Sequence, residues 1–277
     1  MAPGVNRAIL ELHAAEVLTS ATLMARAAAT EEAVNMALAM PSLGVGCHIV
    51  LVDGTPASAP HRIPSLIDNS TGALHSSIGA FLKRLYTARI RAAEIEAEAA
   101  AQIALLQSYG LRLTHIDTHK HMHMFPLILR PVLRAARAAG IRAVRNPFEP
   151  LWSINATAAA PENRRVEVLL LRRLESRFRR VVAQEGFVTT DGAIGVLATG
   201  TLELSVVHAL ISAMPEGTFE FVSHPGYRDE TLARANTRLT ESREIERNAL
   251  VAIKDYAGID HISFAGLHLP APHQSVT

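Results

Sequence analysis

The stretch LRLTHIDTHKHMHMFPLILRPVLRAARAAGIRAVRNP, residues 111–147, contains a strand, a helix and a second strand in succession. Apolar periodicity predicts a strand over residues 111–121, a helix over 126–140 and a strand over 141–147. Two strands that are joined by a helix run parallel when they belong to one sheet. The stretch therefore predicts a parallel α/β architecture.

The same alternation extends outward from this stretch in both directions. On the N-terminal side the predicted elements are a helix over 5–17, a strand over 19–25, a helix over 31–40, a strand over 44–52, an irregular loop or lid over 53–68, and a long helix over 77–107. On the C-terminal side they are an irregular segment over 146–161, a helix over 162–185, a strand over 191–199, a helix over 202–214, a strand over 219–227, a helix over 230–256 and a strand over 261–267. At least six strand-helix units predict an irregular β/α barrel as one domain over residues 1–277. An open doubly wound sheet is the alternative, and the glycine-rich dinucleotide fingerprint that would favour it is absent.

Composition excludes several classes of protein. With 49% hydrophobic and 19% charged residues, the 277-residue chain can bury a large core. A formal net charge of +1 gives no global field for nucleic acid, so no nucleic-acid partner is expected. The single cysteine excludes an internal disulfide framework. No apolar run approaches the roughly 18 residues of a membrane span, and no signal-peptide pattern precedes the first helix. We therefore expect a soluble cytoplasmic protein.

Four histidines lie within THIDTHKHMHMFP, at the predicted C-terminal end of a strand. Alternation places His115, Asp117 and His119 on one strand face, so that two imidazoles and a carboxylate can converge. After His119 the strand is expected to turn, which leaves the direction of His121 open. The alternative is a set of hydrogen-bonded core histidines or a histidine-rich surface loop.

Two further histidines stand at predicted strand ends. His48 lies in the apolar strand GVGCHIVLV, where an unsatisfied imidazole would be unfavourable. His224 lies in SHPGY, where a proline and a glycine force a turn that presents the ring outward, so that it could act as a general acid. Alone, either residue could be structural. Together with the cluster, His48 and His119 would supply two nitrogen ligands to a divalent ion, with a carboxylate as the third ligand, and nitrogen ligands favour zinc.

These segments together resemble the YdjC-like carbohydrate deacetylase family, the ChbG/HpnK group. The matching pieces are GVGCHIVL, THIDTHKHMHMFP, AVRNPFEP and SHPGY; IPSLID, KHMHMFP, VRNPFEP and TTDGAIGVL are most similar to the branch associated with hopanoid glycolipid biosynthesis. The resemblance implies a barrel-like fold and metal-dependent removal of an N-acetyl group from an amino sugar, here on a glycolipid. By position it implies metal-binding roles for His48 and His119, and a place near the reacting amide for His224. Arg145 and His121 are expected to contact the substrate.

The chain departs from the family at its N-terminus. Family members begin with a short strand and an Ala-Asp-Asp-Phe-Gly segment, whose aspartates are expected to supply a metal ligand and a general base. This chain opens MAPGVNRAILELHAAEVLTS, and its first aspartate is Asp53. We therefore expect a domain without its first barrel strand, either because the start codon was assigned downstream of the true one or because this is a truncated copy that could be inactive. Asp117 is then the carboxylate within a recognised motif that could reach the ion, as a catalytic or supporting group.

Other possibilities remain open from the residues alone. Two histidines and a carboxylate also suit another metal hydrolase, such as a phosphoesterase, and an inactive pseudoenzyme would keep the same motifs.

The helix ENRRVEVLLLRRLESRFRR, residues 162–180, carries an apolar stripe beside basic residues. It is either an ordinary packed helix or a membrane-surface contact for a lipid-linked substrate. A homo-oligomer is also compatible with the sequence.

Overall fold

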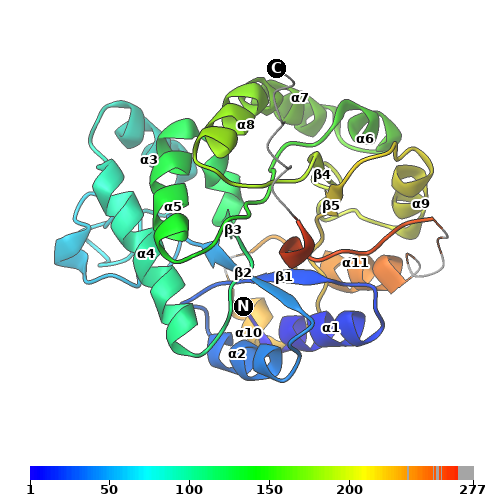
Figure 1. Cartoon of the computed structure of the whole chain (residues 1–277), viewed down its shortest axis with the longest axis horizontal. Coiled ribbons are helices and arrows are strands. Elements are labelled where there is room, and N and C mark those ends of the chain that lie inside the picture. The colour runs from blue at the N-terminus through cyan, green and yellow to red at the C-terminus, as the bar shows by residue number, and fades with distance from the viewer. Residues whose placement is uncertain (236, 252, 254–255, 257, 268–277) are drawn as a thin grey trace, which may run out of the picture.

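Short parallel strands occupy the centre of the molecule and form two sheets (Figure 1). The computed structural model describes residues 1–235, 237–251, 253, 256 and 258–267. In the first sheet β2 (Gly44–Ile49) lies between β1 (Ser20–Leu23) and β3 (His115–Thr118). In the second, β4 (Gly192–Ile194) pairs with β5 (Phe219–Phe221). Because every pair runs parallel, the C-terminal ends of all strands in a sheet lie at the same edge of that sheet.

Residues 141–147 lie beside β3 without forming a regular strand. Val144 forms an isolated parallel bridge with Ile116 of β3, and Ala143 forms one with Val188. The predicted strand is thus reduced to two bridges, although the segment lies where a strand was expected. The mixed α/β class with parallel sheets is confirmed, whereas the closed barrel, the missing first strand and the single domain over 1–277 stay predictions. Residues 268–277 of that domain lie outside the described part.

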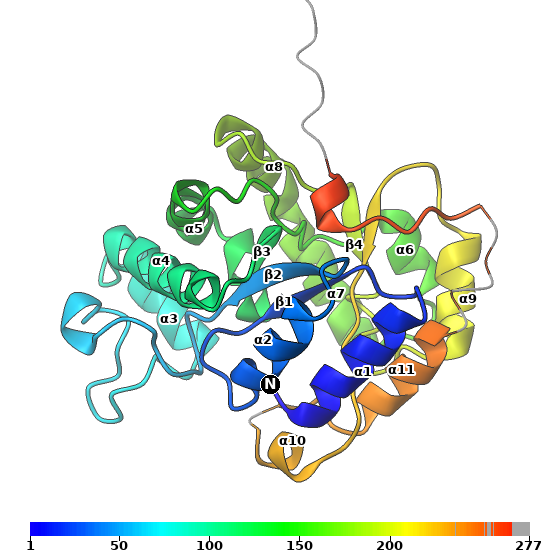
Figure 2. The same cartoon turned by 60° about the horizontal axis from the view of Figure 1, so that its bottom comes forward.

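Helices surround the strands, as the two views show (Figures 1 and 2). The α-helices are α1 (Pro3–Ala14), α2 (Thr30–Leu38), α3 (Ile78–Tyr86), α4 (Ala92–Ser108), α5 (Pro126–Ala138), α6 (Leu151–Ala156), α7 (Glu162–Leu171), α8 (Glu175–Gln184), α9 (Leu204–Ser212), α10 (Glu230–Arg234) and α11 (Ser242–Val251). Short 3₁₀ turns are η1 (Pro60–Arg62), η2 (His119–Met124), η3 (Arg172–Leu174) and η5 (Phe264–Gly266). The main core lies between the first sheet and helices α4, α5 and α8, whose apolar faces cover it.

The predicted helix over 77–107 is wrong in one respect, because the chain forms two helices there. Ala88 has a left-handed backbone (φ 56°), and the Arg89 N–H bonds back to the Arg84 carbonyl at 2.8 Å, which ends α3. The Ser65 hydroxyl then accepts the N–H of Arg91 at 3.1 Å, just before α4 begins. Contacts with the preceding loop therefore outweigh the helix propensity of this alanine-rich segment.

Two C-terminal elements also differ from the prediction. The helix over 230–256 is interrupted after α10, where the Thr237 hydroxyl accepts the Leu239 N–H at 3.1 Å and forms a local turn; residues 236, 252, 254, 255 and 257 lie outside the described part. The strand over 261–267 is wrong. Its backbone groups bond to hydroxyls at the start of β1, since the Phe264 N–H donates to Ser20 Oγ at 3.1 Å and the Ile262 carbonyl accepts from Thr19 at 2.7 Å.

None of the helices in the described part of the chain has the length and apolar character that crossing a membrane requires.

Candidate active site

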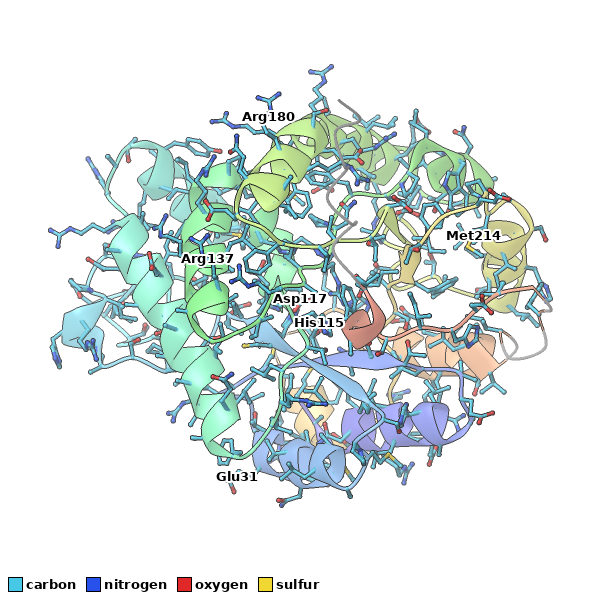
Figure 3. The ribbon with its side chains drawn as sticks, viewed as in Figure 1. Glu31, His115, Asp117, Arg137, Arg180 and Met214 are labelled. Carbon is cyan, nitrogen blue, oxygen red and sulfur yellow. The ribbon has the colours of Figure 1, made fainter. Side chains whose placement is uncertain are left out.

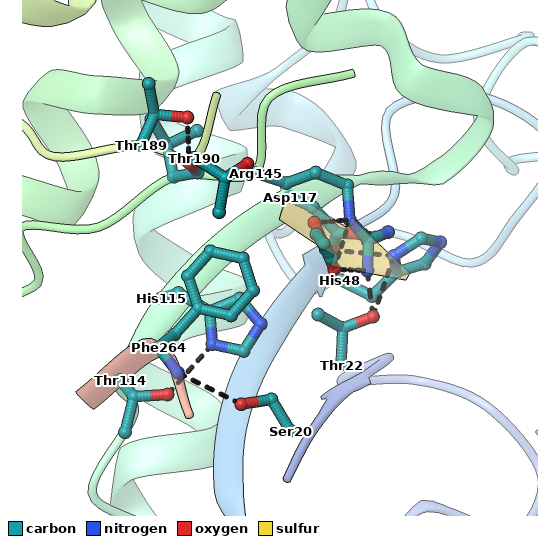
Figure 4. A network of polar contacts seen from close by, with 12 residues as sticks. Ser20, Thr22, His48, Thr114, His115, Asp117, Arg145, Thr189, Thr190 and Phe264 are labelled. Atoms are coloured by element: carbon teal, nitrogen blue, oxygen red, sulfur yellow. Dashed lines mark hydrogen bonds and ion pairs between the residues drawn. The ribbon is translucent and has the colours of Figure 1, made fainter. Parts of the chain in front are cut away.

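The register of β2 and β3 brings the first two predicted site residues together. His48 is paired with Asp117 across the parallel ladder, one residue before each strand ends. His48 Nδ1 lies 2.7 Å from Asp117 Oδ1, and Thr22 of β1 approaches the same ring nitrogen at 3.3 Å (Figure 4). Asp117 is fully buried near the centre of the molecule, whereas Glu31 and Arg180 lie at its rim (Figure 3). The carboxylate therefore fixes the orientation of the imidazole.

Arg145 links this pair to the second sheet. One terminal nitrogen donates a short hydrogen bond to Asp117 Oδ2. The other terminal nitrogen donates to Glu220 Oε1 at 2.6 Å, and Nε donates to both Glu220 oxygens at 2.9 Å. Bidentate hydrogen bonds between a guanidinium and a carboxylate are among the strongest hydrogen bonds in proteins. Carboxylates thus accept hydrogen bonds from two edges of the Arg145 guanidinium. The contact of Arg145 with substrate stays a prediction.

Glu220 is a residue that the sequence prediction missed. It stands in the strand FEF of β5, between two phenylalanines. A lone glutamate inside an apolar strand is the signal that could have drawn attention to it, because a buried carboxylate needs a cation. Only the fold identifies that cation as Arg145.

Charge in this network follows from burial and pairing. Burial alone would raise the pKa of Asp117, but Arg145 and His48 outweigh burial and hold that pKa well below its usual range. Burial raises the pKa of Glu220, with Arg145 opposing it. Burial would lower the pKa of Arg145, but Asp117 and Glu220 raise it above its usual value. Asp117 and Arg145 are therefore ionised across the physiological pH range.

His119 follows β3 directly and faces His48. The two rings have centroids 5.6 Å apart and an interplanar angle of 74°. Burial first, and then His48, lowers the pKa of His119 to about 4, so its ring is neutral near pH 7 and can donate a lone pair. Neither His48 Nε2 nor the His119 ring has a hydrogen-bond partner among the residues that the structure describes.

The geometry of these two histidines can be compared with that of a metal site. Imidazoles that share a tetrahedral zinc have ring centroids about 5 Å apart, from nitrogen-zinc distances of about 2.0–2.1 Å. The observed separation of the His48 and His119 ring centroids is 5.6 Å. In the described ranges no group of three or more histidine, cysteine, aspartate or glutamate side chains is arranged to hold an ion. The site therefore offers a pair of nitrogen donors, with Asp117 behind His48 as the orienting group.

The turn after His119 has an unusual backbone. Lys120 (φ 56°) and His121 (φ 52°) are consecutive left-handed residues, and Lys120 Nζ bonds to Asp53 Oδ2 at 2.8 Å. Residues held in this region store strain that the surroundings must offset. The turn directs His121 toward the cleft, where its Nδ1 is buried without a hydrogen-bond partner among the described residues.

The remaining histidines of the cluster are structural. His123 is fully buried, with Nδ1 2.8 Å from the Thr118 hydroxyl and Nε2 3.1 Å from the Arg145 carbonyl. His115 stands two residues before Asp117 in β3, on the same strand face. Its ring stacks on Phe264 with ring centroids 3.9 Å apart (Figure 4). The imidazole that faces His119 is therefore that of His48 and not that of His115, which is a packed core residue.

His224 reaches the site from the loop after β5. Burial, followed by Arg243, lowers the pKa of His224 to about 3. Its N–H donates to Glu246 Oε2 at 2.5 Å, and Arg243 of α11 donates to its carbonyl at 3.3 Å. Both α11 residues were missed by the sequence prediction, because the stretch SREIERN that contains them is mostly polar.

A cleft of about 1970 Å³ connects these residues. The predicted site residues that line it are His48, His119, His121, Arg145 and His224. Asp117 is not among the lining residues and contributes from behind His48 and Arg145. The fold therefore gathers side chains from four chain segments around one cavity.

Glu149, in the motif AVRNPFEP, has a structural place beside this cleft. Its buried carboxylate accepts hydrogen bonds from the Ser153 hydroxyl at 2.5 Å and from the N–H groups of Gly195 and Leu197 at 3.2 and 2.5 Å. Burial raises the pKa of Glu149, while these donors oppose the rise. The residue therefore ties α6 to the loop that follows β4.

The chain is similar to several known proteins. A carbohydrate deacetylase of Brevibacillus brevis is 44% identical over 147 residues, which are 52% of this chain and 54% of that protein. The chain thus spans about half the length of that relative. A carbohydrate deacetylase of Clostridium beijerinckii is 26% identical over 267 residues, 94% of this chain and 93% of that protein. A candidate cellobiose-phosphate cleavage protein of Enterococcus faecalis V583 has a similar fold, with a TM-score of 0.69, 22% identity, and coverage of 90% of this chain and 86% of that chain. The sequence profile of the YdjC-like proteins matches residues 1–253, and the chain therefore belongs to the YdjC-like protein family.

Proposed function

We propose that this chain removes the acetyl group from an N-acetylated amino sugar by hydrolysis of the amide bond. The observation that carries the proposal is the cleft in which His48, oriented by Asp117, faces His119 while His224 enters from the other sheet. The carbohydrate deacetylases among the relatives support a sugar amide as the target.

His48 and His119 would hold a divalent ion, zinc or magnesium, which when bound supplies Lewis-acid polarisation of the acetyl carbonyl. Two imidazole nitrogens favour zinc or another late transition ion. Asp117 keeps the His48 ring turned so that Nε2 is directed away from the carboxylate, and Arg145 keeps Asp117 ionised.

His224 is the proton-transfer group in this proposal. Because its pKa is about 3, the ring rests neutral and can first accept a proton from the attacking water. The water oxygen bonds to the acetyl carbon, the carbon-nitrogen bond breaks, and the same proton passes to the departing amine nitrogen. Acetate and a free amino sugar leave.

The cleft favours a neutral amide over a phosphate ester. A phosphoesterase would need free cations around the reacting group. Here Arg145 is engaged by Asp117 and Glu220, and Lys120 by Asp53. These two cations are thus already neutralised by carboxylates, which supports the amide.

We further propose a glycolipid, of the hopanoid class, as the substrate, with α7 as the membrane contact. Val166, Leu169 and Leu170 are 46%, 40% and 51% exposed, and none of the residues of α7, all of them described, is buried. Farther along, α8 packs into the core through Phe178 and Val181, so the packed-helix interpretation applies to that half. An exposed apolar helix face beside the cleft suits a lipid surface. The cytoplasmic location and the homo-oligomer stay predictions.

The experiment is an acetate-release assay on N-acetylglucosaminyl glycolipid and on free N-acetylglucosamine oligomers, with p-nitrophenyl phosphate as the competing substrate. Release of acetate by the wild type and its loss in His48→Ala, at added zinc or magnesium, would support the deacetylase. Phosphate release alone would favour the phosphoesterase. No turnover of any substrate, with metal bound, would indicate a pseudoenzyme.

Binding to lipid is tested separately by co-sedimentation with vesicles of anionic phospholipid. Leu169→Ser with Leu170→Ser should reduce the bound fraction, whereas Leu204→Ser, which changes an exposed leucine of α9, should not. Equal binding by both variants would contradict the α7 contact.

A further inference from the structure

Helix α11 carries two opposite charges that are buried one turn apart. Arg243 is 4% exposed and Glu246 is 0% exposed. Charges are expensive to bury unless other groups use them. The contacts of this pair therefore indicate what the helix is for.

Both charges hold the backbone of His224. Glu246 Oε2 accepts the His224 N–H at 2.5 Å, and Arg243 donates to the His224 carbonyl at 3.3 Å. Glu246 Oε1 accepts the N–H of Gly200 at 3.0 Å, which attaches the loop after β4 to the same carboxylate. Helix α11 thus holds the backbone of His224 through both its N–H and its carbonyl.

The ring of His224 also lies against Glu246. Nδ1 is 3.8 Å from Glu246 Oε2, and it is buried without a hydrogen-bond partner among the described residues. The side chain as a whole is 32% exposed and lines the cleft. Because Nδ1 is enclosed, Nε2 is the nitrogen that is left to face the cavity.

We propose that Glu246 is a positioning residue for His224, directing Nδ1–H toward the carboxylate so that the Nε2 lone pair faces the substrate. This inference rests on the proposed deacetylase function. During turnover Nε2 takes a proton from the attacking water, and the Glu246 carboxylate stabilises the imidazolium until that proton passes to the amine nitrogen. The arrangement follows the general logic of a base that is oriented by a third group.

Other charges near His224 oppose or support this protonation. They are Arg243 of α11, Arg145, His48 of β2 and His121, which disfavour the imidazolium, and Asp117 of β3, which favours it. Arg243, Arg145 and His48 each lower the pKa of His224. The Glu246 carboxylate, 3.8 Å from Nδ1, is a second negative group besides Asp117 on the side that favours a positive ring.

The test compares Glu246→Gln with Glu244→Gln in the full chain. Glutamine removes the charge and keeps an acceptor oxygen for one of the two backbone N–H groups that Glu246 binds. Glu244 is a matched control, since it lies on the same helix and its carboxylate accepts the Arg228 N–H at 3.1 Å, away from His224. Histidine side-chain nitrogens are labelled with ¹⁵N and the His224 signals are assigned with His224→Gln.

In the wild type at pH 7 we expect the Nδ1–H tautomer, and in Glu246→Gln a shift toward Nε2–H. The kcat for acetate release should fall about 10–100-fold with KM within threefold and with a changed pH profile, as expected for the loss of an orienting partner. Glu244→Gln should match the wild type in every readout. A wild-type Nε2–H tautomer would overturn the proposal without any variant, as would an unchanged tautomer and pH profile in Glu246→Gln.

The tautomer is measured without substrate, so it separates this inference from the activity. The expected tautomer in a chain that releases no acetate would support the positioning by Glu246 and refute the deacetylase function.

Discussion

Asp117→Asn is the substitution that tests the centre of the site most directly. The side chain is fully buried, lies 2.7 Å from His48 Nδ1 and accepts a short hydrogen bond from Arg145. Asparagine keeps the shape and one acceptor oxygen, so the change removes charge with little change in packing.

The expected loss of stability can be worked from these contacts. Two hydrogen bonds to a charged group contribute about 1.5–3 kcal/mol each, or about 3–6 kcal/mol together. Part of this loss is offset, because Arg145 keeps Glu220 as a partner at 2.6 Å and is not left uncompensated. Removing Asp117 also removes its repulsion of the Glu220 carboxylate. We therefore expect the free energy of unfolding to fall by about 2–4 kcal/mol at pH 7.

The pH dependence gives a second check on the same variant. Arg145 and His48 hold the pKa of Asp117 well below its usual range in the folded chain. A carboxyl group with a lowered folded pKa stabilises the fold above its unfolded pKa of about 3.9, and this stabilisation is lost as pH falls further. The difference between wild type and Asp117→Asn should be constant from pH 8 to about 5 and should shrink below about pH 4.

Urea unfolding followed by fluorescence measures this difference. The single tryptophan, Trp152, packs against Phe219 of β5 with ring centroids 5.2 Å apart, so its emission reports on the second sheet. Asp260→Asn, at an exposed position, is the control and should leave the midpoint unchanged. A loss below about 0.5 kcal/mol, typical of a surface substitution, would refute the reasoning. So would a difference that persists undiminished at pH 3.

Three further outcomes are expected in the same unfolding assay. Gly46→Ala should destabilise the chain by about 1–3 kcal/mol, because a Cβ would lie 2.6 Å from the His115 ring, which stacking on Phe264 holds in place; a wild-type midpoint would contradict that close contact. Glu220→Gln should cost about 1.5–3 kcal/mol through the loss of a charged partner of Arg145, and an unchanged midpoint would show that Asp117 suffices. Burial lowers the pKa of three histidines near the strand ends to about 3 or 4; the unfolded chain therefore binds more protons below about pH 6.5, and the free energy of unfolding should fall as pH goes from 7 to 4. A flat profile over that range would be inconsistent with neutral buried rings.

Much of the first sheet could be predicted from apolar periodicity. The strands that contain His48 and Asp117 were expected where β2 and β3 lie, and parallel pairing brings two strand ends to one edge. The approach of His48 to His119 follows from the same rule, because His119 begins the turn that leaves β3. Local pattern suffices for these residues, since each is positioned by the strand in which it stands or by the one it follows.

Partners that come from distant segments could not be predicted in this way. Glu220 meets Arg145 across 75 residues of sequence, and Glu246 meets His224 from a helix whose composition resembles a solvated surface. Their burial depends on how the second sheet and α11 pack, and the local spacing of apolar residues does not determine that packing. The break at Ala88 has a similar cause, because the Ser65 hydroxyl that accepts the Arg91 N–H belongs to a loop before the helix.

The position of Arg145 between β3 and β5 also affects how the molecule can move. Its guanidinium bonds to Asp117 in one sheet and to Glu220 in the other, so the sheets cannot separate without breaking a buried ion pair. Thermal opening of the second sheet and loss of the oriented His48 ring are therefore coupled events. Amide exchange in β4 and β5 would then occur on the timescale at which the site itself comes apart, and a ligand that holds His48 in place would slow exchange in strands that it does not touch.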